Sequence, residues 1–266
     1  MNDIKSKSAG LDARTRLMTG LIAAGILLVA ALGIYFFDRV RSSERAREMI
    51  NWQVRLGIVA SSRAAAIETW LGDQGNAVQS LAENASLQIY LAELDLLMRA
   101  GSWKLGTAVP EAEYLQNLLA VSAEQAGFVP ERLSTTVSAN VQPAGQAGMA
   151  LLDTKGTVLA ATTHMPPMDE RFRNAMTEAR EGALALIDLH TTSAGSRIGF
   201  VAPIYAIQSG GAGSEVIGFV AAIRGPGQDF FSRLDQPGDD SRIGETYLIR
   251  RSGKMIEYIS PLADGT

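Results

Sequence analysis

The 266-residue sequence contains no cysteine and only two histidines, His164 and His190. The absence of cysteine excludes disulfides, thiolate nucleophiles and thiolate metal sites, and the shortage of histidine argues against a histidine-rich metal centre. The formal net charge is −4, and residues 1–37 carry +2 of it, so the remaining 229 residues sum to −6. This mildly acidic body has no basic stripe. Nucleic-acid binding needs clustered Lys and Arg, so we expect no nucleic-acid partner.

Recognisable catalytic and cofactor motifs are lacking as well. There is no Gly-x-Ser-x-Gly nucleophile elbow, and the glycine-rich stretch 209–214 lacks the lysine of a phosphate-binding loop. His164, Asp169 and Glu170 do not have the spacing of metal ligands on one helix face, since two prolines intervene. We therefore expect a non-enzymatic chain without cofactor or metal; an enzyme would require a cluster of carboxylates in one cleft.

One long uncharged run is present near the N-terminus. Leu17–Phe37 are 21 residues without a charge, which as a helix would span roughly 32 Å, about the thickness of a bilayer core. A cleaved signal peptide is the alternative, but its apolar run is usually shorter and ends in small residues, whereas this one ends in Ile34-Tyr-Phe-Phe37. The sequence predicts a cytoplasmic tail over 1–15 and a transmembrane helix over 16–37. Lys and Arg flank the run on both sides, so the preferred single-pass topology, with the bulk outside the inner membrane, rests on simplicity.

Residues 38–146 are predicted to be mainly helical. Apolar positions recur at helical spacing from 38 to about 99, as one helix or two, and Gly72 and Gly75 weaken it locally. Ile67, Leu71, Val78 and Leu81 approximate a coiled-coil seam, which is compatible with a stalk, a dimer interface or the backing of a domain. Pro110 and Gly127 bound a further helix, and residues 130–146 are predicted to form a connection.

From residue 147 the period changes to that of strands. Residues 148–153 and 157–161 form a predicted hairpin, 168–182 a helix, and 183–189, 198–207 and 215–224 three strands. This order predicts an α+β fold: an antiparallel PAS-like sheet over 147–224, with a crossover helix between its second and third strands.

The segment after this sheet repeats its opening hairpin. Residues 225–243 are predicted to be a linker that contains a short helix, and 244–250 and 254–260 are predicted strands joined at Ser252-Gly253. The strand–turn–strand pattern lies about 97 residues after its counterpart at 148–161. We therefore expect the start of a second PAS-like module over 244–266, incomplete after its first hairpin.

The order of elements resembles a double-Cache sensor domain of bacterial transmembrane signalling proteins. The resemblance covers about residues 38–266 and includes Leu151-Leu-Asp-Thr-Lys-Gly-Thr-Val158, Val201-Ala-Pro-Ile-Tyr205 and Val216-Ile-Gly-Phe-Val220. It implies a membrane-distal module followed by a membrane-proximal one. Members usually continue into a second transmembrane helix and an output domain such as a diguanylate cyclase, histidine kinase or chemoreceptor hairpin, none of which is found here. The Arg-x-Trp motif of amino-acid-binding members is also absent, which argues against that mode of binding.

Candidate ligand-binding residues were chosen by their expected position near the pocket between sheet and helix. A guanidinium pair on the crossover helix is able to clamp a carboxylate, although both arginines would be solvated if that face is exposed. The tyrosine and histidines have similar alternatives as sheet core or exposed loop residues, and an ion pair with Asp229 or Asp235 is the alternative for the arginine at 224. The candidates are His164, Arg171, Arg173, His190, Arg197, Tyr205 and Arg224.

These features predict a region that senses a small ligand, with carboxylates among the candidates, and that passes a shift through its long helix to the membrane within a homodimer. The alternative is a membrane-anchored structural or protein-interaction module with a PAS-like head. A filled, dry interior would favour the interaction module, and a cavity with inward polar groups would favour sensing. The sequence does not identify the ligand or the output domain.

Overall fold

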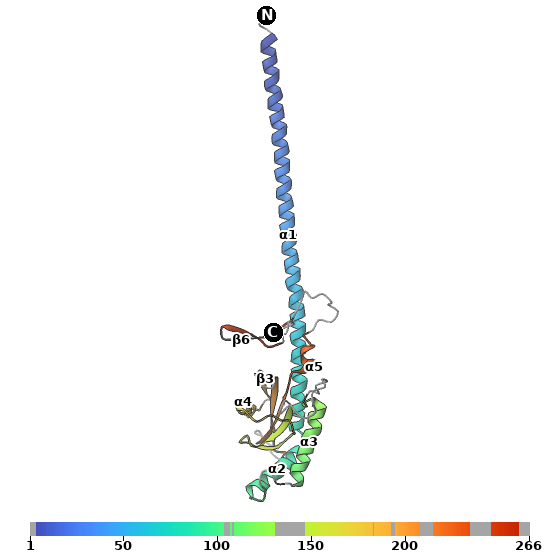
Figure 1. The fold of residues 1–266 in the computed structure, drawn as a ribbon, viewed down its shortest axis with the longest axis vertical. Helices are drawn as coiled ribbons and strands as arrows, with labels where there is room; N and C mark the ends of the chain where they lie inside the picture. Colours follow the sequence, from blue (N-terminus) through green and yellow to red (C-terminus); the bar gives the residue numbers. More distant parts are fainter. Residues whose placement is uncertain are drawn as a thin grey trace, which may run out of the picture. The chain divides into compact units, whose positions relative to one another are not determined.

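The computed structural model describes residues 4–103, 107, 109–130, 147–182, 184–192, 195–207, 215–234 and 246–260. The chain divides into two compact units, one up to Ser62 and the other from Arg63 onward. The first unit consists of most of one helix, α1 (Ile4–Ala82), whose last turns belong to the second unit. The second unit holds the remaining helices and all described strands, and the site lies there (Figure 1).

Residues 17–37, where a transmembrane helix is expected, lie within α1, but most of their side chains are outside the described part of the chain. Among the residues that are described, no helix is long and apolar enough to cross a membrane. The transmembrane helix over 16–37 and the tail over 1–15 therefore remain predictions.

Three helical segments of the second unit follow the expected start and stop signals. The long helix ends at Ala82, and α2 (Ala85–Arg99) begins after Asn84, whose side chain accepts a hydrogen bond from the amide of Leu87. The helix α3 (Pro110–Ala126) begins at the predicted proline and ends before Gly127, which has φ of 74°. Of the two alternatives left open for 38–99, one helix or two, the structure shows two, with the break at residues 83–84.

The strands form the expected antiparallel sheet with a helix inserted between its second and third strands. The strand order β2-β1-β5-β4-β3 is antiparallel throughout, a mixed helix-and-sheet arrangement consistent with a PAS-like module. In the β1–β2 turn Gly156 has φ of 88°, which meets the need for a positive φ in this turn. The bounds are β1 (Gly148–Leu152), β2 (Val158–Ala161), α4 (Glu170–Ala179), β3 (Ala185–Thr192), β4 (Gly195–Tyr205) and β5 (Val216–Arg224).

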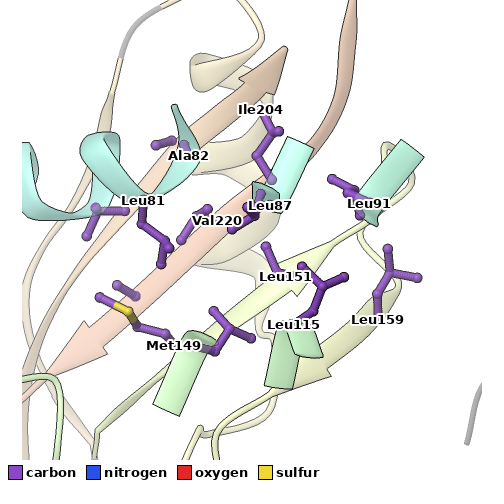
Figure 2. Close-up of a cluster of buried hydrophobic side chains, with 14 of the residues drawn as sticks. Leu81, Ala82, Leu87, Leu91, Leu115, Met149, Leu151, Leu159, Ile204 and Val220 are labelled. Carbon is purple, nitrogen blue, oxygen red and sulfur yellow. The ribbon is translucent and has the colours of Figure 1, made fainter. Parts of the chain in front are cut away.

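Each face of this sheet carries its own apolar core. On the helix face, strand residues pack with the end of α1 and with α2 and α3 (Figure 2); these strand residues are Met149, Leu151, Leu159, Phe200, Ala202, Ile204, Val220 and Ala222. On the opposite α4 face, Phe172, Ala175, Met176 and Ala179 pack on Ala150, Leu152, Ala185, Ile187, Val201, Phe219, Ala221 and Ile223. The alternation of neighbouring residues between two buried faces is the pattern of a sheet covered on both sides.

The end of α1 backs the sheet. Val78, Leu81 and Ala82 belong to the helix-face core, which settles this part of the predicted seam as the backing of a domain. Gly75, predicted to weaken the helix, is buried, and a Cβ there would lie 2.4 Å from Cδ2 of Leu184. Its role is therefore to permit a close approach to Leu184.

A third core and a second small sheet complete the unit. The short helix α5 (Gly227–Phe231) follows Gly225-Pro226, as expected, and Phe230 joins Ile67, Trp70, Leu189, Ile198 and Leu234 in this core. The second hairpin consists of β6 (Ile249–Ser252) and β7 (Met255–Tyr258), which pair antiparallel. The second copy of the strand–turn–strand pattern is thus confirmed as a hairpin.

Several expectations fall wholly or partly outside the described residues. These include the connection over 130–146, the loop over 209–214, and much of the linker over 225–243 and of the incomplete module over 244–266. The domain limits at 146/147 and 224/225 likewise remain predictions.

Candidate functional site

Arg197 is a buried cation in the sheet. It lies on β4 with only 9% of its surface exposed, and its Nε has no hydrogen-bond partner. A buried donor without a partner costs free energy, so most buried polar groups in proteins are satisfied. Nε of Arg63 is a second such donor, but Arg63 also donates through Nη1 to the backbone oxygen of Arg233 at 3.3 Å. Arg197 is therefore the first residue to consider for a ligand.

Register places Arg197 on the α4 face. Val201, four residues along β4, packs in the α4-face core, and alternate residues of a strand share a face. On β3 the partner of Arg197 is His190, after an irregularity between Ile187 and His190. The expected strand ended at 189, but β3 continues to Thr192, so His190 lies inside the strand and beside Arg197.

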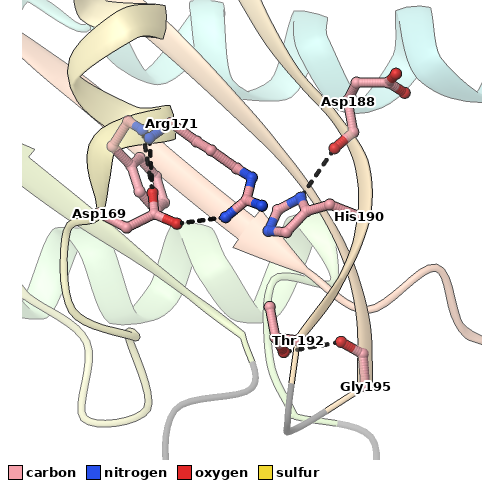
Figure 3. A network of polar contacts seen from close by, with 7 residues as sticks. Asp169, Arg171, Asp188, His190, Thr192 and Gly195 are labelled. Atoms are coloured by element: carbon pink, nitrogen blue, oxygen red, sulfur yellow. Dashed lines mark hydrogen bonds and ion pairs between the residues drawn. The ribbon is translucent and has the colours of Figure 1, made fainter. Parts of the chain in front are cut away.

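The N-terminus of α4 brings a second guanidinium and a carboxylate to the same place. Asp169 caps the helix by accepting from the amides of Arg171 (3.0 Å) and Phe172 (3.3 Å). Nη1 of Arg171 forms an ion pair with Asp169 Oδ2 at 3.0 Å. Figure 3 shows the Arg171 side chain extending from α4 toward the ring of His190 on β3. The fold therefore assembles what we call the Arg197 cluster: Asp169, Arg171, His190 and Arg197.

Within the Arg197 cluster, the surroundings disfavour the charged form of Arg197 and favour the charged form of Asp169. Burial lowers the pKa of Arg197, although the charge of Asp169 acts in the opposite direction. Burial alone would raise the pKa of Asp169, but hydrogen bonds from Arg171 and Phe172 and the charge of Arg171 together bring it below its ordinary value. Asp169 forms its ion pair with Arg171, and Nε of Arg197 has no hydrogen-bond partner.

This arrangement favours an anionic ligand. Two guanidinium groups, those of Arg171 and Arg197, interact with the carboxylate of Asp169. The His190 ring donates through Nδ1 to the backbone oxygen of Asp188 at 2.9 Å, so this nitrogen is already engaged. Guanidinium groups bind carboxylates and phosphates through paired hydrogen bonds. No group of three or more His, Asp or Glu suited to a metal ion is found in the described part of the chain.

Two other predicted residues lie on or beside the α4 face but outside the Arg197 cluster. Arg173 is exposed on α4, one residue beyond the buried Phe172. Tyr205 ends β4 as expected, half-buried, and its hydroxyl lies 3.5 Å from where a Cβ on Gly182 would be. Eight residues of strand separate Tyr205 from Arg197, or roughly 27 Å. The predicted set is therefore not one pocket.

Arg224 is engaged on the helix side of the sheet. Its Nη2 pairs with Asp229 at 2.9 Å, its Nη1 donates to Gln74 Oε1 at 3.2 Å, and its guanidinium lies 5.3 Å from the ring centroid of Trp70. Trp70 Nε1 also donates to Asp229, at 2.9 Å. The ion pair between Arg224 and Asp229, stated above as the alternative to a ligand role, is confirmed.

His164 lines a separate hollow. This hollow of about 160 Å³ lies between α3 and the loop after β2, with a floor of Ala123, Phe128 and Ala147 and with Gln116, Glu124 and His164 among its lining. None of the Arg197 cluster lines it. His164 and His190 therefore lie at different sites, one in this hollow and the other in the Arg197 cluster.

Sequence reasoning missed two residues of these sites. Asp169 was considered only as a metal ligand, although an Asp immediately before a helical pattern is an N-cap signal that would have placed it beside Arg171. Trp70 is not among the predicted site residues, and its hydrogen bond to Asp229 joins residues 159 positions apart. Local sequence patterns do not predict a contact between residues that lie so far apart in the chain.

Comparisons with known proteins add little to this geometry. No protein-family model and no curated protein matches the chain. Among solved structures, the sensor domain of the V. cholerae histidine kinase DctB is similar with a TM-score of 0.43 and 11% sequence identity, over 70% of this chain and 59% of that one. The chain thus spans less than two thirds of that neighbour, and a likeness of this degree does not establish a shared fold.

Proposed function

We propose that this chain is the sensing region of a membrane-anchored signal transducer, and that it binds a small anion, such as a carboxylate, at the Arg197 cluster. The observation that carries the proposal is the buried Arg197 guanidinium, whose Nε has no partner. An anion bound there would satisfy this donor and offset the cost of burying the charge. Arg171 stands beside it as a further donor, and His190 is its register partner on β3.

Anchoring is proposed from the sequence. The uncharged run Leu17–Phe37 is long enough to cross a bilayer, and α1 leads without interruption from this run to the sheet. We infer a single-pass inner-membrane protein with the sheet module outside the cytoplasm. We also infer a homodimer formed through the long helix, because Met49, Trp52 and Leu56 are exposed and follow a 3–4 spacing. The output that such a sensor would drive is assigned to no residue of this chain.

A thermal-shift titration tests ligand binding. The full chain in mild detergent is titrated with sodium malonate, sodium acetate, sodium phosphate and, as a cationic control, ethylammonium chloride. A ligand at about 100 times its Kd stabilises the folded state by about 2.7 kcal/mol, so we expect malonate to raise Tm by roughly 5 °C and ethylammonium to have no effect.

Matched arginine variants localise the effect. Arg197→Met keeps an unbranched apolar stem and removes the charge, and it should abolish the malonate shift. Arg173→Met removes an exposed guanidinium from α4 and should retain the shift. A folded protein that responds to none of the three anions, or a shift that survives Arg197→Met, contradicts the proposal. The former result favours the protein-interaction module.

A further inference from the structure

Each strand residue of the Arg197 cluster has a chain neighbour that packs against α1. On β4, Ile198 follows Arg197 and lies in the core with Trp70 and Phe230. On β3, Leu189 precedes His190 and joins the same core. One pair of strands therefore carries candidate ligand contacts on one side and α1 contacts on the other.

Arg224 holds α1 at this point of the sheet. In the register of β4 and β5 it is the partner of Ile198. Its side chain is only 13% exposed and joins three elements: β5 itself, α5 through Asp229 and α1 through Gln74 and Trp70. Charge-assisted hydrogen bonds of this kind are stronger than neutral ones, although the Asp229 side chain is 47% exposed.

A second contact ties the β6–β7 hairpin to the same strand. Arg250 pairs with the Asp188 carboxylate at 2.9 Å and also donates to the backbone oxygen of Leu189. The backbone oxygen of Asp188 in turn accepts from His190. Asp188 and Leu189 thus connect the hairpin to the candidate ligand site within two residues.

We propose that this corner of the sheet is a relay, in which Arg224 is the positioning residue that couples an anion at Arg197 to the packing of Trp70 on α1. This inference rests on the proposed function. An anion draws Arg197 and His190 toward α4. Because Ile198 and Leu189 are the next residues on the same strands, both shift relative to Trp70. A ligand moves such an equilibrium only if it binds the two packings with different affinity, so removing the Arg224 contacts must change the affinity for the anion.

Fluorine NMR of the full chain labelled with 5-fluorotryptophan reads this coupling directly. The three tryptophans, Trp52, Trp70 and Trp103, give three resonances that single Trp→Phe variants assign. We expect malonate to shift the Trp70 resonance and to leave that of Trp52 in place. In Arg224→Met the shift should disappear and the Kd for malonate should change about 5-fold, the lower end of typical coupling, although Arg224 lies on the opposite side of the sheet.

A matched control and a milder variant keep the outcome interpretable. Arg99→Met removes a surface arginine that pairs with Asp95 on α2, and it should change neither the resonance nor the Kd. If Arg224→Met does not fold, Gln74→Ala removes only the 3.2 Å contact to α1 and should weaken the Trp70 shift.

The results separate failure of the relay from failure of the proposed function. Malonate binding with an unmoved Trp70 resonance, or an unchanged Kd in Arg224→Met, overturns the relay and leaves the sensing role intact. If malonate does not bind the wild type, the proposed function fails, and the relay is then tested without ligand. Arg197→Met alone should shift the Trp70 resonance, whereas Arg173→Met should not; equal spectra for both variants overturn the relay.

Discussion

On the helix face of the five-stranded sheet, α1, α2 and α3 cover an apolar core of leucine, phenylalanine, valine and alanine side chains. On the α4 face, the middle of the sheet is covered in the same way, but the N-terminal end of α4 meets Arg197 and His190. The first face contributes stability. The second face also contains the buried guanidinium of Arg197, whose Nε has no hydrogen-bond partner. Such local exceptions to favourable packing are expected at functional sites.

The largest expected effect breaks the helix face. Phe200 is 2% exposed there, with its ring in edge-to-face contact with Phe128 at 6.1 Å between centroids. Phe200→Ala should lower the free energy of unfolding by about 3–5 kcal/mol, because it leaves a cavity in a rigid core. Urea denaturation measures the change. Phe200→Leu fills most of the space and should cost about 1 kcal/mol.

Phe200→Ala and Phe200→Leu also test whether the helix face affects ligand binding on the α4 face. At temperatures where Phe200→Leu remains folded, malonate should bind it with the wild-type Kd, since Phe200 faces away from the Arg197 cluster. A loss below 1 kcal/mol in Phe200→Ala, or a large change of Kd in Phe200→Leu, would mean that the two faces do not divide stability and binding in this way.

A second variant tests the α4 face, where we expect the free energy of unfolding to rise instead of fall. Arg197→Met removes a buried charge and an unsatisfied donor while keeping a shorter, unbranched apolar stem. We expect the free energy of unfolding to rise by about 1–2 kcal/mol in the absence of ligand. Arg173→Met, at an exposed position, should change it by less than about 0.5 kcal/mol.

The pH dependence of this gain follows from the direction of the pKa shift. Burial lowers the pKa of Arg197 in the folded state, so folding disfavours the charged form. The penalty is present in full at every pH below the folded-state pKa of Arg197 and is lost as pH rises from that pKa to the higher ordinary pKa of arginine. Urea curves at pH 6 and pH 8 should therefore show the same gain. Destabilisation by Arg197→Met would instead indicate that the guanidinium supports the apo fold.

The elements of the sheet module were predictable because their signals are local. The β1–β2 turn needs a glycine at a positive φ within a few residues of two apolar runs, and α3 has its proline and glycine at the expected ends. The pair Arg224–Asp229 was within reach for the same reason, since only five positions separate the two residues.

Positions fixed by distant segments were not predictable in the same way. Gly75 looks like a weak point of a helix until Leu184, more than a hundred residues later, is seen to occupy the space of its Cβ. The register of β3 passes through an irregularity between Ile187 and His190, and this irregularity decides that His190 faces Arg197. A period-two pattern does not reveal such a shift, so the sequence supplied a set of candidates but not their grouping.

The smallest expected effect concerns Asp169, the carboxylate of the α4 face. Its folded pKa lies below the ordinary 3.8, so its ionised form contributes stability that is present above this value and is lost as pH falls through the folded pKa. Asn is as good a cap as Asp, so Asp169→Asn isolates the charge and should cost about 0.5 kcal/mol at pH 7 and nearly nothing at pH 2.5. Asp169→Ala loses the cap as well and should cost about 1 kcal/mol at pH 7.

Ligand affinity should move in the other direction. The Asp169 carboxylate holds Arg171 in an ion pair and places a negative charge near Arg197, so it competes with any anion bound there. Asp169→Asn should therefore lower the Kd for malonate several-fold while it slightly destabilises the apo protein. Isothermal titration at pH 7 measures this, and Asp95→Asn on α2, which removes a carboxylate paired with Arg99, is the control for net charge. Weaker binding in Asp169→Asn would instead assign Asp169 to the positioning of Arg171.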